Sequence, residues 1–191
     1  MFMKAELTDW QAKKFRTLFD LFDTDGNQTI DEAELDGGME RLQIDTGWPE
    51  HSRVLSHVTA RWKIFLRSLF QDTPVLTEQK WLDYVARYLQ KDRQQRSENP
   101  GHRGGLEEFA QLLFLLLDRD RNSKIDYQEF LILFYALGRH DSDAEEAFEK
   151  LDTDQDGFLQ KSELEDMTLE FFHGSEPGSH GDWLFGPPPA A

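Results

Sequence analysis

Three twelve-residue stretches constrain this chain more than any other feature: residues 23–34 (DTDGNQTIDEAE), 118–129 (DRDRNSKIDYQE) and 152–163 (DTDQDGFLQKSE). Each places an oxygen-bearing side chain at positions 1, 3 and 5, an aliphatic residue at position 8 and a glutamate at position 12. A tight turn brings alternate side chains inward, so that six to eight oxygens can surround one hard divalent cation. The spacing therefore predicts three metal-binding loops.

This spacing is typical of the EF-hand calcium loop, which lies between an incoming and an outgoing amphipathic helix. The flanking apolar residues agree with that arrangement. Before the first loop they recur at helical spacing behind Thr8, the expected N-cap: Phe15, Leu18, Phe19 and Phe22. After it the pattern continues through Leu35, Met39 and Leu42, until Gly47-Trp48-Pro49 ends the helix.

The next two predicted helices span residues 50–70 and 77–89, the second capped by Thr77. Their expected inward residues are Val54, Val58, Trp62, Phe65 and Leu69, then Trp81, Val85, Tyr88 and Leu89. Between them, residues 71–80 (QDTPVLTEQK) stand where a loop is expected, but Lys80 replaces the closing glutamate. We interpret this unit as a degenerate hand retained for pairing, with Leu76 facing Ile30 across a short strand pair.

Residues 91–105 are polar, basic and rich in turn residues, which indicates a linker. The third and fourth hands follow, with a Gly138 helix cap, a capping box formed by Ser142 and Glu145, and Ile125 facing Leu159. The predicted fold is all-α, with four helix-loop-helix units in two pairs. Its predicted parts are residues 1–90, the linker 91–105, residues 106–173 and a C-terminal tail, 174–191.

Each loop offers four acidic residues, a side-chain amide and a backbone carbonyl as candidate calcium ligands. In the first and third hands the amide is an asparagine at position 5, whereas the fourth hand has aspartate at position 5 and glutamine at position 9. The first set is Asp23, Asp25, Asn27, the carbonyl of Thr29, Asp31 and Glu34. The third-hand set is Asp118, Asp120, Asn122, the carbonyl of Lys124, Asp126 and Glu129. The fourth-hand set is Asp152, Asp154, Asp156, the carbonyl of Phe158, Gln160 and Glu163.

Position 6 of these loops turns sharply, often at positive φ, and normally holds glycine. Gly157 satisfies this, whereas Gln28 and Ser123 each cost on the order of 1 kcal/mol. We expect weakened rather than abolished binding there. The ligand charge predicts dissociation constants of about 10⁻⁸ to 10⁻⁵ M, with calcium preferred and Mg²⁺ competing at millimolar levels.

The formal net charge of −16 comes mostly from the loops, because twelve of the 37 acidic residues are candidate ligands. This balance argues against a nucleic-acid partner. The chain has no cysteine, which excludes disulfides and zinc-thiolate sites. We found neither a signal peptide at the start nor an apolar run long enough to span a bilayer, and expect a cytoplasmic monomer.

Two minor alternatives concern charged residues outside the loops. Arg61, Lys63 and Arg67 could form a basic segment for a membrane or calmodulin, but are more simply a solvated helix face. His173 and His180 near Asp182 could bind a transition metal, but histidines in a glycine-rich segment are usually incidental.

The tail combines glycines and prolines that exclude a helix with an apolar triplet, Trp183-Leu184-Phe185. We expect it to fold back into a hydrophobic groove, the alternative being an exposed partner-binding motif. Four hands with a ligandless second hand, on a chain carrying DWLFGP at residues 182–187, resemble the sarcoplasmic calcium-binding protein and calexcitin family, with its bacterial calerythrin-like members. The resemblance covers nearly the whole chain and implies one compact globule.

The resemblance also implies a non-enzymatic calcium buffer or modest sensor. An alternative is a sensor that exposes an apolar groove to a protein target. Coelenterazine-binding proteins and photoproteins share the scaffold, and photoproteins use a histidine on the last helix and a tyrosine near the C-terminus. Here Phe171 and Phe185 stand near those places, with His173 out of register, which argues against luminescence.

Overall fold

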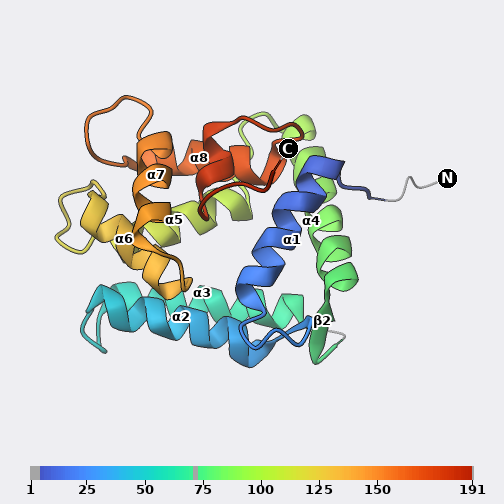
Figure 1. The fold of residues 1–191 in the computed structure, drawn as a ribbon, viewed down its shortest axis with the longest axis horizontal. Coiled ribbons are helices and arrows are strands. Elements are labelled where there is room, and N and C mark those ends of the chain that lie inside the picture. Colours follow the sequence, from blue (N-terminus) through green and yellow to red (C-terminus); the bar gives the residue numbers. More distant parts are fainter. Residues whose placement is uncertain (1–4, 71–72, 191) are drawn as a thin grey trace.

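The computed structural model describes residues 5–70 and 73–190, and helices dominate that part of the chain (Figure 1). The first half contains α1 (Asp9–Phe22), β1 (Thr29–Asp31), α2 (Glu32–Thr46), α3 (Arg53–Leu69), β2 (Val75–Thr77) and α4 (Glu78–Glu98). The second half contains α5 (Gly105–Leu117), α6 (Tyr127–Ala136), α7 (Asp141–Leu151), α8 (Lys161–His173) and a 3₁₀ helix, η1 (His180–Trp183). The predicted all-α fold of four helix-loop-helix units is confirmed.

Short antiparallel contacts join the loops in pairs. Strands β1 and β2 place Ile30 opposite Leu76. In the second half Ile125 and Leu159 form an isolated bridge, exchanging N–H···O=C bonds of 2.9 and 2.8 Å. Both predicted pairings are confirmed, although Gln71 and Asp72 of the degenerate loop lie outside the described residues.

Most helix ends follow their local sequence signals. Thr8 and Gln11 form a reciprocal capping box at the start of α1, and Thr77 caps α4. Gly47 ends α2 in the left-handed region, at φ 67°. The predicted capping box of Ser142 with Glu145 is wrong, because α7 begins two residues earlier than a Ser142 cap requires, at Asp141, after an extended His140.

Two further helix predictions need correction. Helix α4 continues to Glu98, so the first half of the predicted linker is helical; contacts one turn apart, including Arg96 with Asp92, stabilise this polar extension. Helix α3 is slightly shorter than predicted, and Phe65 is 36% exposed rather than inward. The buried face of α3 is centred on Leu55 and Leu66 instead.

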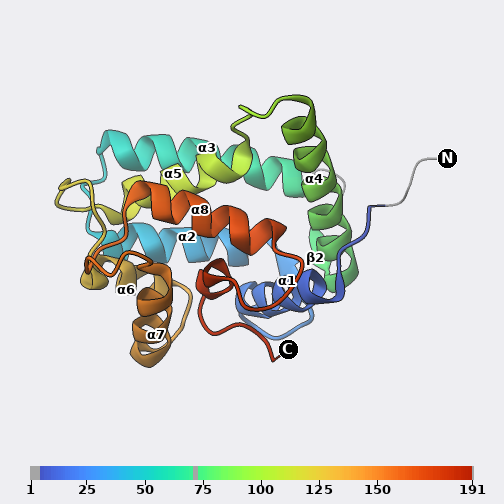
Figure 2. The same ribbon diagram turned by 90° about the horizontal axis from the view of Figure 1, so that it is seen from above.

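One hydrophobic core joins both halves. Its buried residues form a single cluster to which every α-helix contributes. Helix α2 packs on α6, where Arg41 Nε donates to the carbonyl of Ala136. Trp48, which follows α2, donates through Nε1 to the carbonyl of Leu116 on α5. Figure 2 shows α5 and α8 running side by side, close to α3. The expected single globule is confirmed, and no helix in the described ranges is both long and apolar enough to cross a membrane.

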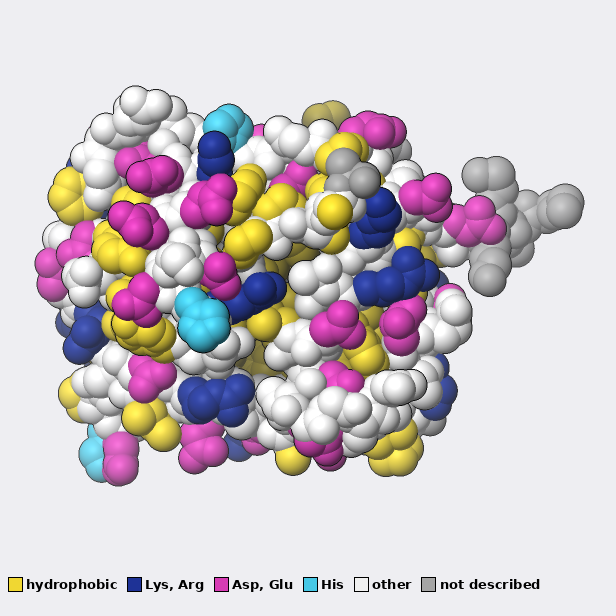
Figure 3. All heavy atoms as spheres, viewed as in Figure 1, with side chains coloured by type: hydrophobic (Ala, Val, Ile, Leu, Met, Phe, Trp, Pro, Cys, Tyr) yellow, Lys and Arg dark blue, Asp and Glu magenta, His cyan; other side chains and the backbone are white. Residues whose placement is uncertain are grey.

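The C-terminal segment lies across α7 and α8 beside α1 (Figure 1). Leu184 is fully buried, and the Phe185 ring contacts Phe171 edge-on at a centroid distance of 4.9 Å. Gly181 allows this close approach, since a Cβ there would lie 2.5 Å from the Met167 carbonyl. On this face, apolar side chains gather around a central hollow (Figure 3).

Candidate metal centres

The same pattern of hydrogen bonds stabilises all three predicted loops. The position-1 aspartate accepts the N–H of position 6 through Oδ2, at 2.8 Å for Asp23, 3.2 Å for Asp118 and 2.9 Å for Asp152. The position-3 aspartate accepts the N–H of position 5, and the position-5 side chain accepts that of position 7. The loops therefore turn around their own carboxylates.

The closing glutamate of each loop accepts hydrogen bonds from both the start and the later part of that loop. One oxygen of Glu34, Glu129 and Glu163 accepts the N–H of position 2, and the other accepts the N–H of position 9. This brings the side chain from the outgoing helix back over the start of the loop. Glu129 and Glu163 are buried, and Glu34 is half-buried.

The backbone at position 6 adopts the left-handed region in all three loops, as predicted. Its φ is 65° at Gln28, 66° at Ser123 and 84° at Gly157. Position 4 does the same, with Arg121 and Gln155 at 61° and 59°. Non-glycine residues in this region cost on the order of 1 kcal/mol each, so the loops maintain a conformation that disfavours most side chains.

Carboxylate oxygens of the predicted ligands converge within each loop. One oxygen from each of three acids lies within 4.8 Å of the others in these sets: Asp23, Asp25 and Glu34; Asp118, Asp120 and Glu129; Asp152, Asp154 and Asp156. In addition, Asp118 Oδ1 is buried and accepts no hydrogen bond among the described residues. A buried carboxylate oxygen without a donor fits a cation, and an all-oxygen set suits calcium or magnesium.

The electrostatics of the loops indicate crowded negative charge. Burial raises the pKa of Glu129, against the lowering effect of its backbone hydrogen bonds. Desolvation and the neighbouring carboxylates of Asp156, Glu163 and Asp152 raise the pKa of Asp154. A bound dication would offset this crowding.

Position 9 has a different role from the other predicted ligands. Asp31 and Asp126 cap α2 and α6, accepting the N–H groups of Glu34 and Glu129 at 2.9 Å. Gln160 donates to Asp154 Oδ2 at 3.1 Å. These engagements fit a ligand acting through water better than direct contact.

The degenerate hand contains its own cation. Lys80, at position 12, donates to the Thr73 hydroxyl, at position 5, with a distance of 2.8 Å. An ammonium thus binds an oxygen that would face an ion in a functional loop. The sequence identified the missing glutamate, but did not predict this internal contact.

The two histidines considered as transition-metal ligands have separate partners. His173 Nε2 lies 2.8 Å from Asp92 Oδ2 on α4, and burial lowers its pKa, whereas Asp92 raises it. His180 Nδ1 lies 2.7 Å from the Lys150 carbonyl. Both rings therefore fasten the C-terminal region to neighbouring helices.

Comparison with known proteins agrees with the loop geometry. A protein-family model described as EF hand matches residues 144–168, the fourth unit. The fold is an EF-hand globule. Calcium-binding protein CML19 of Arabidopsis thaliana is 25% identical over 170 residues, covering 88% of this chain and 89% of its own length.

Solved structures support the same fold. Photoprotein clytin superposes with a TM-score of 0.75 at 18% identity, covering 96% of this chain and 98% of its own. Magnesium-loaded apo-berovin, a ctenophore photoprotein, gives 0.68 at 20% identity, covering 86% and 89%. Together these matches support an EF-hand calcium-binding protein.

Proposed function

We propose that this chain is a non-enzymatic, cytosolic calcium buffer with three functional hands, the first, third and fourth. One observation carries the proposal: three separate loops use the same hydrogen bonds to bring carboxylate oxygens within 4.8 Å of one another. Bound calcium would supply the positive charge that offsets their repulsion. The ligandless second hand would contribute only its strand pairing with the first.

Magnesium is the expected competitor. All three calcium-binding loops of berovin bind magnesium in the structure cited above. The loops of this chain present oxygen ligands with a closing glutamate, which can reach bidentately around the larger calcium ion but suits the tighter magnesium octahedron less well. We therefore propose calcium preference, with magnesium occupying the loops when calcium is scarce.

Calorimetric titration with calcium, in the presence and absence of millimolar Mg²⁺, tests this function. We expect three ions per chain, and one fewer for each of Glu34→Gln, Glu129→Gln and Glu163→Gln. Glu149→Gln is the matched control, since Glu149 is exposed on α7 and is not a proposed ligand. A wild-type protein that binds no calcium would refute the proposal.

The buffer role is favoured over the sensor role by the enclosed C-terminal segment. A sensor must expose apolar surface on loading, but Leu184 is fully buried and Asp182 is paired with Lys14 inside the fold. We expect a dye for exposed apolar surface to respond only weakly to calcium. A large calcium-dependent rise in dye fluorescence would support the sensor instead.

The tail and the ligandless second hand also support placement near the sarcoplasmic calcium-binding protein and calexcitin group. A luminescent role receives less support, because Phe171 and Phe185 stand near the places where photoproteins use a histidine and a tyrosine, and His173 lies against Asp92 instead. Incubation with coelenterazine followed by calcium should give no light; emission would overturn this assignment.

A further inference from the structure

Lys124 contacts both candidate sites of the second half. Its backbone carbonyl stands at position 7 of the third loop, where it is a proposed ligand. Its side chain leaves that loop, and Nζ lies 2.9 Å from Oδ2 of Asp156, a proposed ligand at position 5 of the fourth loop. One residue therefore contacts both proposed metal sites.

The Lys124 side chain is held in place from more than one direction. Its ammonium also lies 4.4 Å from the centroid of the Phe158 ring, within the range of a cation–π contact. The adjacent bridge between Ile125 and Leu159 fixes the two loops relative to each other. The ion pair is therefore part of the loop–loop contact rather than a chance meeting of two mobile side chains.

The carboxylate of Asp156 has donors on both oxygens. Oδ1 accepts the Phe158 N–H at 2.9 Å, and Oδ2 accepts Lys124 and, at 3.4 Å, Gln160 Nε2. An ion entering the fourth loop would either displace one of these donors or share the carboxylate with an ammonium. In both cases a positive charge stands close to the incoming dication.

Only the third loop places a charged position-7 side chain on its partner loop. The position-7 residue of the fourth loop is Phe158 and that of the first loop is Thr29, so neither carries a charge toward its partner loop. The fourth hand has the most complete ligand pattern, including Gly157, yet its position-5 aspartate is bound to a lysine from its neighbour. Ligand identity alone would therefore overestimate its affinity.

We propose that Lys124 is an affinity-setting residue for the fourth hand: its ammonium competes with calcium for Asp156, stabilises the metal-free loop, and links that loop to the third site through its own carbonyl. This inference rests on the proposed function. It predicts that the fourth hand binds calcium more weakly than its ligand set implies, and that this deficit disappears when the ammonium is removed.

The first test measures calcium binding in a Glu34→Gln chain, which retains the paired third and fourth hands. The Gly157 amide resonance follows filling of the fourth hand during titration. We expect Lys124→Gln to tighten that site by about threefold to tenfold, with a smaller gain at high salt. Lys161→Gln, the control, removes an equal charge from the fourth loop itself, where Lys161 faces Glu165 rather than a proposed ligand, and should change affinity less than about twofold.

The second test needs no metal. Urea unfolding in a chelator, applied to Lys124→Gln, Asp156→Asn and the double variant, measures the coupling between the two side chains. We expect Lys124→Gln to destabilise the wild type but not the Asp156→Asn chain. Absence of coupling, or equal calcium affinity in Lys124→Gln and Lys161→Gln, would overturn the role of Lys124. A wild type that binds no calcium would instead overturn the proposed function.

Discussion

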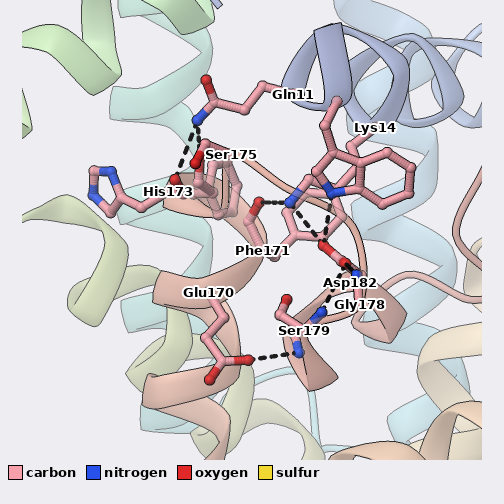
Figure 4. A network of polar contacts seen from close by, with 12 residues as sticks. Gln11, Lys14, Glu170, Phe171, His173, Ser175, Gly178, Ser179 and Asp182 are labelled. Carbon is pink, nitrogen blue, oxygen red and sulfur yellow. Dashed lines mark hydrogen bonds and ion pairs between the residues drawn. The ribbon is translucent and has the colours of Figure 1, made fainter. Parts of the chain in front are cut away.

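The buried ion pair between Lys14 and Asp182 yields the sharpest stability prediction. Lys14 on α1 and Asp182 on η1 are 0% and 1% exposed at their side chains, with Nζ 2.9 Å from Oδ1. Figure 4 shows how the two residues meet between α1, α8 and the C-terminal segment. The pair thus fastens the tail to the first helix.

Asp182 and Lys14 differ in the number of hydrogen bonds that each keeps when its partner is removed. Without Lys14, Asp182 still accepts three N–H bonds, from Trp10 Nε1 and from the backbone of Gly178 and Ser179. Without Asp182, the Lys14 ammonium retains the Phe171 carbonyl, at 2.6 Å, and three N–H groups lose their acceptor.

We therefore expect Lys14→Met to lower the free energy of unfolding by about 1–3 kcal/mol and Asp182→Ala to lower it by about 3–5 kcal/mol. The double variant removes both buried charges, so it should be more stable than Asp182→Ala alone. Urea unfolding in a chelator, followed by circular dichroism, measures all three. Arg16→Gln is the control on the same helix, because the Arg16–Glu78 pair is half exposed and contributes about 0–1 kcal/mol.

The order of these effects tests the reasoning independently of their size. If Lys14→Met destabilises more than Asp182→Ala, the three N–H donors do not stabilise the remaining carboxylate. If the double variant is less stable than Asp182→Ala, the isolated ammonium is not the source of the cost. Either result would refute the account of the pair.

Three further predictions concern the hands and their junction. Glu163→Gln should weaken calcium binding at the third hand as well as the fourth, because the Ile125–Leu159 bridge joins the loops; an unchanged third-site affinity in calorimetry would contradict this coupling. Gln28→Gly should raise the metal-free free energy of unfolding by about 0.5–1 kcal/mol, since φ is 65° there, and a loss of stability in urea unfolding would show that the side chain contributes more than the strain costs. Partial burial alone would raise the pKa of Glu107, but hydrogen bonds from Arg96 and from backbone N–H groups outweigh it and lower the pKa to about 2. Because its folded pKa lies below its unfolded value, Glu107 stabilises the fold above about pH 4.5 and loses that contribution as pH falls toward 2; urea midpoints of wild type and Glu107→Gln should converge over that range, and parallel curves would argue against the shift.

Features set by near neighbours in the sequence were predictable. The loops follow from ligand spacing, and the caps at Thr8, Gly47 and Thr77 follow from residues within one turn. The pairing of the loops was predictable from position 8, because each half of the chain has two such aliphatic residues, and they pair with each other: Ile30 with Leu76 and Ile125 with Leu159. Ligand identity itself stays a prediction, since the geometry shows convergence of oxygens and not an ion.

Features set by distant partners were not predictable. The polar segment after Leu89 resembles a linker, but Asp92 accepts a hydrogen bond from Arg96 and lies against His173. Arg96 also binds Glu107 through two nitrogens. Contacts with α5 and α8 add to the one-turn contacts within α4, and no local pattern reveals them. The inward face of α3 was misjudged for the same reason, since Phe65 fits the helical period but lies at the edge of the contact.

Three lysines show that a count of acidic residues leaves out the cations that the chain itself supplies. Lys80 binds Thr73 in the degenerate hand, Lys124 binds Asp156, a proposed ligand of the fourth hand, and Lys14 pairs with Asp182 where the tail meets α1. Each places an ammonium on an oxygen that the sequence alone leaves unpaired. The free energy of calcium binding is the difference between the calcium-bound loop and the metal-free loop. A lysine that pairs with a carboxylate stabilises the metal-free loop, so such a loop should bind calcium more weakly than an identical loop without the lysine. The affinities of the hands should therefore rank by the cations the chain supplies as well as by the carboxylates it presents.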